Sequence, residues 1–170
     1  IRDSIYAEKR VFKSVLMIHD VGSRTKERPY CSRVGSTQAV KNALRLKEIN
    51  PTVKVHHLYR DMRTYFLNDV LYQRAQQQDM AFIRYDEEKG IGVSEDSAGK
   101  LAVHFNDIGK GEELKLTPDL LVLGAAILPG EDNEALSALL GIPLDEDRFF
   151  AEDDYMTLTP VDFTKKGIFM

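Results

Sequence analysis

The chain has 170 residues, 43% of them hydrophobic, and its 27 acidic residues exceed its 23 basic ones to give a formal net charge of -4. This length is enough for one hydrophobic core and short for two, so we expect a lead-in segment at 1–12 and a single domain at 13–170. Basic residues are scattered among acidic ones, a distribution that excludes the electrostatic footprint of nucleic-acid binding. Cys31, the single cysteine, cannot form an internal disulfide, and no apolar run reaches the ~18 residues of a membrane-spanning helix. We therefore expect a cytoplasmic protein without direct membrane insertion, attached to any membrane complex only through partner subunits.

The first expected unit is a strand, a loop and a helix. Residues 15–18 form a continuous apolar run, as expected of a parallel strand covered on both faces. From Ser36 the hydrophobic residues follow helical spacing, and Asn50-Pro51 ends that helix. Ser36 or Thr37 is predicted to cap its first turn. The loop between strand and helix would then lie at the carboxyl edge of the sheet, where ligands of doubly wound α/β proteins bind.

The next elements complete a βαβαβ unit. A second strand is predicted at 53–59, a helix from about 64 to 78, and a third strand at 80–84. The helix is indicated by apolar residues at helical intervals, which are Leu67, Val70, Leu71 and Ala75.

Shorter elements follow. Alternating stretches at 100–105 and 112–116 with turns between them predict an antiparallel meander over one face of the sheet. A buried strand at 118–124 ends in small residues, where another backbone could approach closely. A helix at 133–140 is expected to end at Gly141 in a left-handed cap, and the tail at 149–170 to form a hairpin or strand pair. The expected fold class is α/β, a doubly wound parallel sheet plus an antiparallel β-meander.

The candidate cofactor-binding residues lie at the two ends of the first loop. They are Gly22, Ser23, Arg24, Gly35, Ser36 and Thr37. The loop lacks the Gly-x-Gly-x-x-Gly spacing of a dinucleotide fingerprint, which argues against pyrophosphate binding. The amides at 35–37 could hold an anion or begin an ordinary capped helix, and we favour the capped helix.

Arginines follow the second strand, where dinucleotide folds distinguish a ribose from its 2′-phosphate. Without a phosphate cradle in the first loop, we interpret Arg60 and Arg63 as solvent-exposed or interface residues. Cys31 could be a residual ligand or a redox thiol, but we interpret it as a small loop residue. A reactive thiol needs surroundings that lower its pKa, and Arg33 alone is weak evidence for them.

The histidines do not predict a metal site. His56 and His57 are adjacent in a strand, so their rings point to opposite faces and cannot bind one ion. His19 and His104 have no Cys or His at ligand spacing. We assign no histidine to catalysis and predict no metal ligand.

Several longer motifs are more specific than a general α/β pattern. They are Val21-Gly-Ser-Arg24, Pro29-Tyr-Cys-Ser-Arg-Val34, Thr37-Gln-Ala-Val-Lys-Asn-Ala43, Leu58-Tyr-Arg-Asp61 with Arg63-Thr-Tyr65, Phe82-Ile-Arg-Tyr85, and Pro160-Val-Asp-Phe163 with Gly167-Ile-Phe169. With the order of elements, they resemble the inserted NAD(P)-binding domain of thioredoxin-reductase-like, FAD-dependent disulfide reductases. The resemblance is strongest to the A subunit of heterodisulfide reductase and its relatives in quinone-interacting membrane-bound oxidoreductase complexes.

The resemblance implies cofactors for the parent protein that this chain is not expected to hold. FAD would be bound by segments outside the chain. In the family the first loop looks like a four-iron four-sulfur site, whose cysteines would correspond here to Asp20, Cys31, Gly35 and Ser36. Only one of the four is a cysteine, and oxygen is a poor substitute for thiolate at such clusters. We therefore predict no iron–sulfur cluster in this domain unless other subunits supply the ligands.

Three functions remain open. The resemblance implies a domain of an FAD-containing, iron–sulfur-associated electron-transfer oxidoreductase, catalytically silent alone and partnered by other subunits of an electron-transfer complex. A second hypothesis is the NAD(P)H-binding domain of a pyridine-nucleotide flavoprotein reductase. A third is a non-catalytic domain that docks subunits.

Overall fold

The computed structural model describes residues 12–32, 34–97, 99–152 and 162–169. The chain divides into two compact units. One unit comprises Ile1–Arg24 and Cys31–Ala126, and the other Thr25–Tyr30 and Ile127–Met170. The expectation of one domain at 13–170 stays a prediction.

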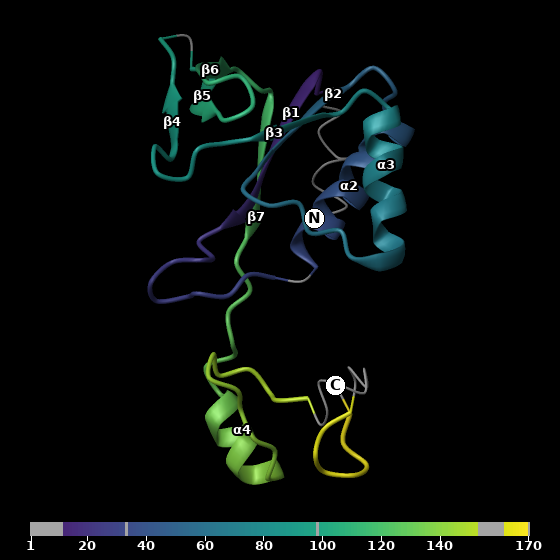
Figure 1. The fold of residues 1–170 in the computed structure, drawn as a ribbon, viewed down its shortest axis with the longest axis vertical. Coiled ribbons are helices and arrows are strands. Elements are labelled where there is room, and N and C mark those ends of the chain that lie inside the picture. Colours follow the sequence, from purple (N-terminus) through teal and green to yellow (C-terminus); the bar gives the residue numbers. More distant parts are fainter. Residues whose placement is uncertain (1–11, 33, 98, 153–161, 170) are drawn as a thin grey trace. The chain divides into compact units, whose positions relative to one another are not determined.

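The first unit is built on a four-stranded parallel sheet in the order β3-β2-β1-β7 (Figure 1). Its strands are β1 (Ser14–Val21), β2 (Lys54–Tyr59), β3 (Ala81–Arg84) and β7 (Leu120–Ala125). β1 is central because it pairs with β2 on one side and β7 on the other. The predicted βαβαβ order is confirmed.

Two helices, α2 (Gly35–Ile49) and α3 (Asp69–Gln77), cover one face of this sheet (Figure 1). Val15 and Met17 of β1 point to this side and pack in one hydrophobic cluster with Val40 and Leu44 of α2. The predicted apolar face of the first helix is therefore its buried face.

A three-stranded antiparallel meander covers the other face, as predicted. Its strands are β4 (Ile91–Glu95), β5 (Leu101–Asp107) and β6 (Glu112–Leu116), in the order β4-β5-β6. Leu16 and Ile18 of β1 pack here in a second cluster with Val103 and Phe105 of β5. Four consecutive residues of β1 thus alternate between two hydrophobic layers, which explains the uninterrupted apolar run in the sequence.

Two predictions about elements are wrong in detail. The second helix begins at Asp69, after a 3-10 turn, η1 (Phe66–Asn68), rather than near residue 64. Of the apolar residues at helical intervals that indicated this helix, Leu67 and Val70 are 89% and 62% exposed. The predicted buried strand, β7, is an edge strand whose Leu123 is 55% exposed.

The second unit contains α4 (Asn133–Leu140), which ends as predicted at Gly141 in the left-handed region, with φ +67°. Isolated antiparallel bridges join Leu144 to Phe150 and Asp162 to Phe169. The predicted hairpin at 149–170 falls partly outside the described residues. Within the described ranges no helix is long and apolar enough to cross a bilayer.

Gly124 is a point of close backbone approach, as the run of small residues predicted. A Cβ built on it would lie 3.2 Å from the Ile18 carbonyl oxygen and 3.5 Å from the His19 Cα of β1. Because both contacts are backbone atoms of the central strand, they cannot move without disturbing its pairing.

We predict that Gly124→Ala lowers the free energy of unfolding by about 1–3 kcal/mol, because the added methyl group overpacks the β1–β7 contact. Urea denaturation measures the change. Gly92→Ala on β4 is the control, since a Cβ there would meet nothing closer than 3.9 Å. Equal effects of the two substitutions would contradict the close-approach argument.

Candidate functional site

The carboxyl edge of the parallel sheet carries a short, tightly folded loop after β1. Asp20, Gly22 and Arg24 all have left-handed backbone conformations, with φ of 55°, 80° and 55°. The pairing of β1 with β7 shifts register between Ile18 and Val21. The strand therefore ends in an irregular turn that directs polar side chains toward the amino end of α2.

Arg60 closes this loop from the end of β2. Its Nη2 donates hydrogen bonds to the carbonyl oxygens of Asp20 and Ser23 at 2.9 and 3.1 Å, and its Nη1 donates to Glu87 Oε1 at 2.6 Å. Arg60 is only 8% exposed, so its interpretation as a solvent-exposed or interface residue is wrong. The guanidinium thus donates hydrogen bonds to loop carbonyl groups that lie outside the strand pairing. Arg60 therefore has a structural role, although it lies where related folds bind ligands.

A second group of arginines surrounds Asp61. Arg24 Nη1 donates to Asp61 Oδ2 at 2.5 Å, and Arg63 and Arg84 approach the same carboxylate at 3.8 and 3.7 Å. Partial burial acts to raise the pKa of Asp61, but the hydrogen bond and charge of Arg24, with the charges of Arg63 and Arg84, hold it below its usual value. One carboxylate thus faces three guanidinium groups, and the edge keeps an excess of positive charge.

The amino end of α2 differs from the predicted cap. No side chain caps the helix, and the Ser32 hydroxyl accepts hydrogen bonds from the Val34 and Gly35 amides just before it. Ser36 is 1% exposed and faces His19 instead, so the expectation that Ser36 or Thr37 caps the first turn is wrong.

Asp20 lies against this helix end. It is 7% exposed, and its Oδ1 would be 3.5 Å from a Cβ built on Gly35. Burial raises the pKa of Asp20, while the charges of Arg60, Arg63 and Arg24 act to lower it. Its Oδ2 is buried without a hydrogen-bond partner.

A buried polar chain links β2, β1 and α2 behind the loop. His19 Nε2 lies 2.9 Å from His57 Nδ1, and His19 Nδ1 lies 3.5 Å from the Ser36 hydroxyl. The His57 ring stacks on Phe82 at 4.5 Å. This histidine pair was not predicted, because the two residues are 38 positions apart in the sequence. Parallel pairing of β1 with β2 in the observed register could have indicated that they are neighbours.

The six predicted site residues fall at this edge, in two groups. Gly22, Ser23 and Arg24 form the loop, where Ser23 is 2% exposed and its hydroxyl donates to the Asp20 carbonyl oxygen. Gly35, Ser36 and Thr37 form the first turn of α2. Asp20 Oδ1 reaches Gly35, so the structure brings the two groups together through a residue outside the predicted set.

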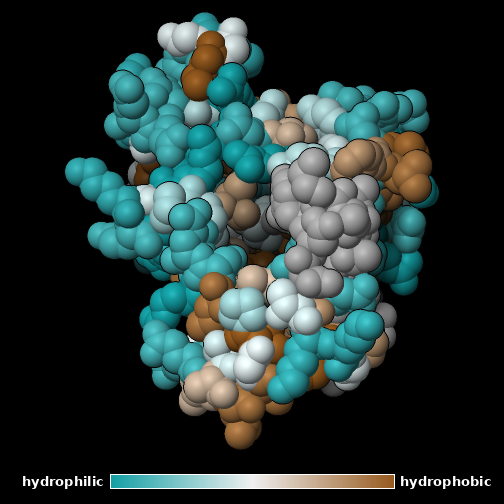
Figure 2. All heavy atoms as spheres, turned by 60° about the horizontal axis from the view of Figure 1, so that its bottom comes forward, coloured by the Kyte–Doolittle hydropathy of each residue, from teal (hydrophilic) through white to brown (hydrophobic). Residues whose placement is uncertain are grey.

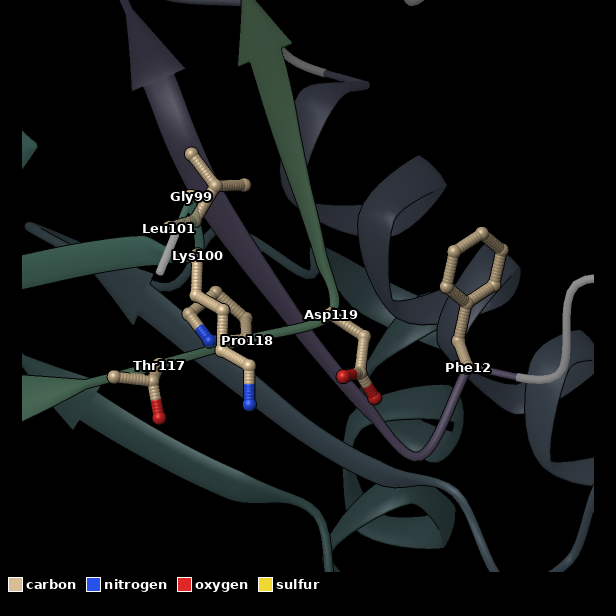
Figure 3. A pocket seen from close by; sticks show the side chains of 7 residues that line it. All are labelled: Phe12, Gly99, Lys100, Leu101, Thr117, Pro118 and Asp119. Atoms are coloured by element: carbon tan, nitrogen blue, oxygen red, sulfur yellow. The ribbon is translucent and has the colours of Figure 1, made fainter. Parts of the chain in front are cut away.

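A separate hollow of about 510 Å³ lies at the opposite, amino edge of the sheet (Figure 3). Lys100 and Asp119 line it on either side. The Asp119 carboxylate already accepts hydrogen bonds from the Lys13 and Ser14 amides at 2.7 and 2.9 Å. The Asp119 carboxylate therefore holds the start of β1 in place, and the carboxyl edge remains the candidate site.

Sequence comparison finds relatives of the chain, although no family model matches it. The iron-sulfur A subunit of CoB–CoM heterodisulfide reductase from Methanocaldococcus jannaschii is 36% identical over 159 residues, covering 91% of this chain. The A subunit of H(2):CoB-CoM heterodisulfide,ferredoxin reductase from Methanothermobacter thermautotrophicus is 32% identical over 162 residues, covering 93% of this chain. This chain is homologous to a segment of the A subunit of heterodisulfide reductase. It spans 24% of the length of each of these two relatives.

Solved structures share the fold at lower identity. Thioredoxin reductase of T. acidophilum matches with a TM-score of 0.53 at 16% identity, covering 92% of this chain and 42% of that one. Thioredoxin reductase of Lactococcus lactis matches with a TM-score of 0.52 at 17% identity, covering 94% and 43%. The predicted fold class is confirmed, with the parallel sheet and separate meander of thioredoxin-reductase-like domains.

The residues at the family's cluster positions do not fit a cluster. Where the resemblance to the heterodisulfide reductase A subunit places four thiolates, Asp20, Gly35 and Ser36 offer a carboxylate, no side chain and a buried hydroxyl, and only Cys31 is a thiol. Nor do they fit a pyrophosphate, since a carboxylate stands against the helix end where a phosphate would bind. Among the described residues no three His, Cys, Asp or Glu side chains gather to hold a metal ion.

The His19–His57 pair predicts a loss of stability in mild acid. Burial lowers the pKa of His19 to about 4 and, with the charges of His19 and His56, that of His57 to about 3. Between pH 6.5 and about 4 the unfolded chain binds more protons than the folded chain, so stability is full above pH 6.5 and falls as the pH drops. For His19 alone the loss is on the order of 3 kcal/mol.

Urea denaturation between pH 4 and pH 7 measures this slope. His19→Leu combined with His57→Phe should reduce it, while His56, whose pKa is also lowered by burial, keeps the remainder. Asp20 acts in the opposite sense because its pKa is raised, so it cannot produce the predicted loss. A slope as steep in the double variant as in the unaltered chain would exclude the histidine pair as its source.

Proposed function

We propose that this chain is a domain of an FAD-linked electron-transfer oxidoreductase similar to the A subunit of heterodisulfide reductase. The observation that carries the proposal is identity of 30–36% with such subunits over about nine tenths of the chain or more. In the parent protein FAD would perform the electron chemistry, and this domain would cover the flavin and dock partners. On its own the chain should be catalytically silent.

The carboxyl edge supports a scaffolding role in place of a cofactor-binding one. Arg60, which stands where a dinucleotide's ribose or phosphate would be selected, donates its hydrogen bonds to loop carbonyls and Glu87. Asp61 likewise engages Arg24. The charged groups that could bind a ligand are largely committed to one another.

A docking role for the same domain has its own support in exposed hydrophobic side chains. Phe66 and Leu67 are 91% and 89% exposed, and Phe66 has φ of +51°, which is unusual for a bulky residue. Figure 2 shows hydrophobic side chains at the surface among hydrophilic ones. The relatives are named as subunits, so the partners we propose are other subunits of an electron-transfer complex.

We predict that the purified chain contains no stoichiometric iron or acid-labile sulfide, because one thiol cannot hold a four-iron four-sulfur cluster. Metal analysis after anaerobic iron–sulfur reconstitution measures this, together with the absorbance near ~400 nm that thiolate-bound clusters show. Cys31→Ser is the matched control and should leave the baseline unchanged. A thiolate–iron band that disappears in that variant would refute the prediction.

We also predict no saturable heat when NADH or NADPH is titrated into the chain, and no co-purifying flavin, because the loop has no phosphate cradle. Calorimetry and the visible spectrum measure the two outcomes. Saturable NADH binding would instead favour a pyridine-nucleotide reductase domain. Flavin in the full-length parent, with none in this chain, would be the pattern expected of the proposed function.

A further inference from the structure

The amino end of α2 has the ingredients of an oxyanion site. The helix has 15 residues and begins at Gly35, whose amide donates to the Ser32 hydroxyl, while no side chain caps the first turn that follows. The first amides of a helix have no intrahelical acceptor and carry the positive end of the helix dipole. This end also lies at the carboxyl edge of a parallel sheet, where such amides bind phosphate and sulfate in other proteins.

Arginines add positive charge at the same place. Arg60, Arg63 and Arg24 all act electrostatically on Asp20, which lies against the helix end. Arg63 and Arg24 are partly exposed, with side chains 31% and 30% accessible. An anion at this end of α2 would therefore meet helix amides and guanidinium groups together.

The position is already taken by a carboxylate of the chain itself. Asp20 is more than nine-tenths buried, its Oδ1 lies 3.5 Å from the place a Cβ on Gly35 would take, and its Oδ2 is buried without a hydrogen-bond partner. Burial disfavours the charged form of this carboxyl group and raises its pKa, and the charges of Arg60, Arg63 and Arg24 oppose that effect. Its left-handed backbone, with φ of 55°, turns it back over the loop.

We propose that Asp20 is an internal anion that closes a latent oxyanion site at the amino end of α2. The ligand class excluded is a tetrahedral oxyanion, such as sulfate, inorganic phosphate or a phosphate ester. Asp20 excludes it by occupying the space against Gly35 and by neutralising the field of Arg60 and Arg63. The proposal concerns this edge alone and holds whatever cofactors the parent protein carries.

The test removes the carboxylate and titrates sulfate, which stays doubly charged across the working pH range. Asp20→Asn removes the charge alone, and Asp20→Gly removes charge and side chain; both residues tolerate a left-handed backbone, so neither strains the loop. Asp79→Asn is the matched control, because Asp79 is exposed and also left-handed, with φ of 54°, but lies in the turn between α3 and β3. Amide chemical shifts at low ionic strength report both affinity and location.

We expect sulfate to bind the two Asp20 variants about tenfold or more tightly than it binds the unaltered chain or Asp79→Asn, since one opposing charge at short range is removed. The shifts should centre on Gly35, Ser36 and Thr37, and adding Arg63→Met to Asp20→Asn should remove most of the gain. Equal affinity in all proteins, or a gain whose shifts fall elsewhere, would overturn the proposal. If Asp20→Gly does not fold, Asp20→Asn decides it alone.

Discussion

The central strand β1 is confined by hydrophobic packing on both of its faces, and the other elements take their places from it. Val15 and Met17 are buried on the helix side, Leu16 and Ile18 on the meander side, and all four are 5% exposed or less. At roughly 25 cal/mol for each Å² of apolar surface removed from water, burial of such residues is the main favourable term in folding. A shift of one residue would exchange the two sets, so the register is strongly determined.

The packing of β1 on both faces also determines which side chains lie at the carboxyl edge of the sheet. The alternation that places Val15 and Met17 on the helix side places His19 there too, against His57 and Ser36. The strand then leaves regular pairing, and Asp20 turns back toward Gly35. Arg60 reaches the same turn because β2 runs parallel to β1 and ends beside it. The polar edge is thus a direct consequence of strand order and direction.

The sequence predicted the elements whose hydrophobic period is clear, and failed where tertiary contacts decide. Continuous and helical apolar patterns located β1, β2, β3, α2 and α4 closely. β4 was not located because four of its five residues are exposed, so the strand carries no strong apolar signal. Helix α3 was predicted to begin too early because Leu67 continues its apolar period, although that residue lies in η1 and is exposed.

The location of the candidate site could be predicted from the sequence, but the contacts among its residues could not. The rule that ligands bind at the carboxyl ends of parallel strands correctly directed attention to the first loop. It could not indicate that Ser36 would face a histidine in place of capping a helix, or that Arg60 would be buried, because both depend on partners far away in sequence. The sequence indicated Asp20 only as a position where the family resemblance places a cysteine. Its proximity to Gly35 depends on a left-handed backbone turn, which no local sequence pattern predicts.

Core and edge are separable in this fold, which explains how the architecture can be kept while the site changes. Val15 and Leu16, which pack the sheet against its two covering layers, precede the turn. The turn instead stabilises itself, through the bonds from Arg60 to the Asp20 and Ser23 carbonyls. Because an arginine satisfies those carbonyls, the loop is held by hydrogen bonds within the chain itself. Identity of about a third with heterodisulfide reductase subunits can therefore coexist with a carboxyl edge of different chemistry.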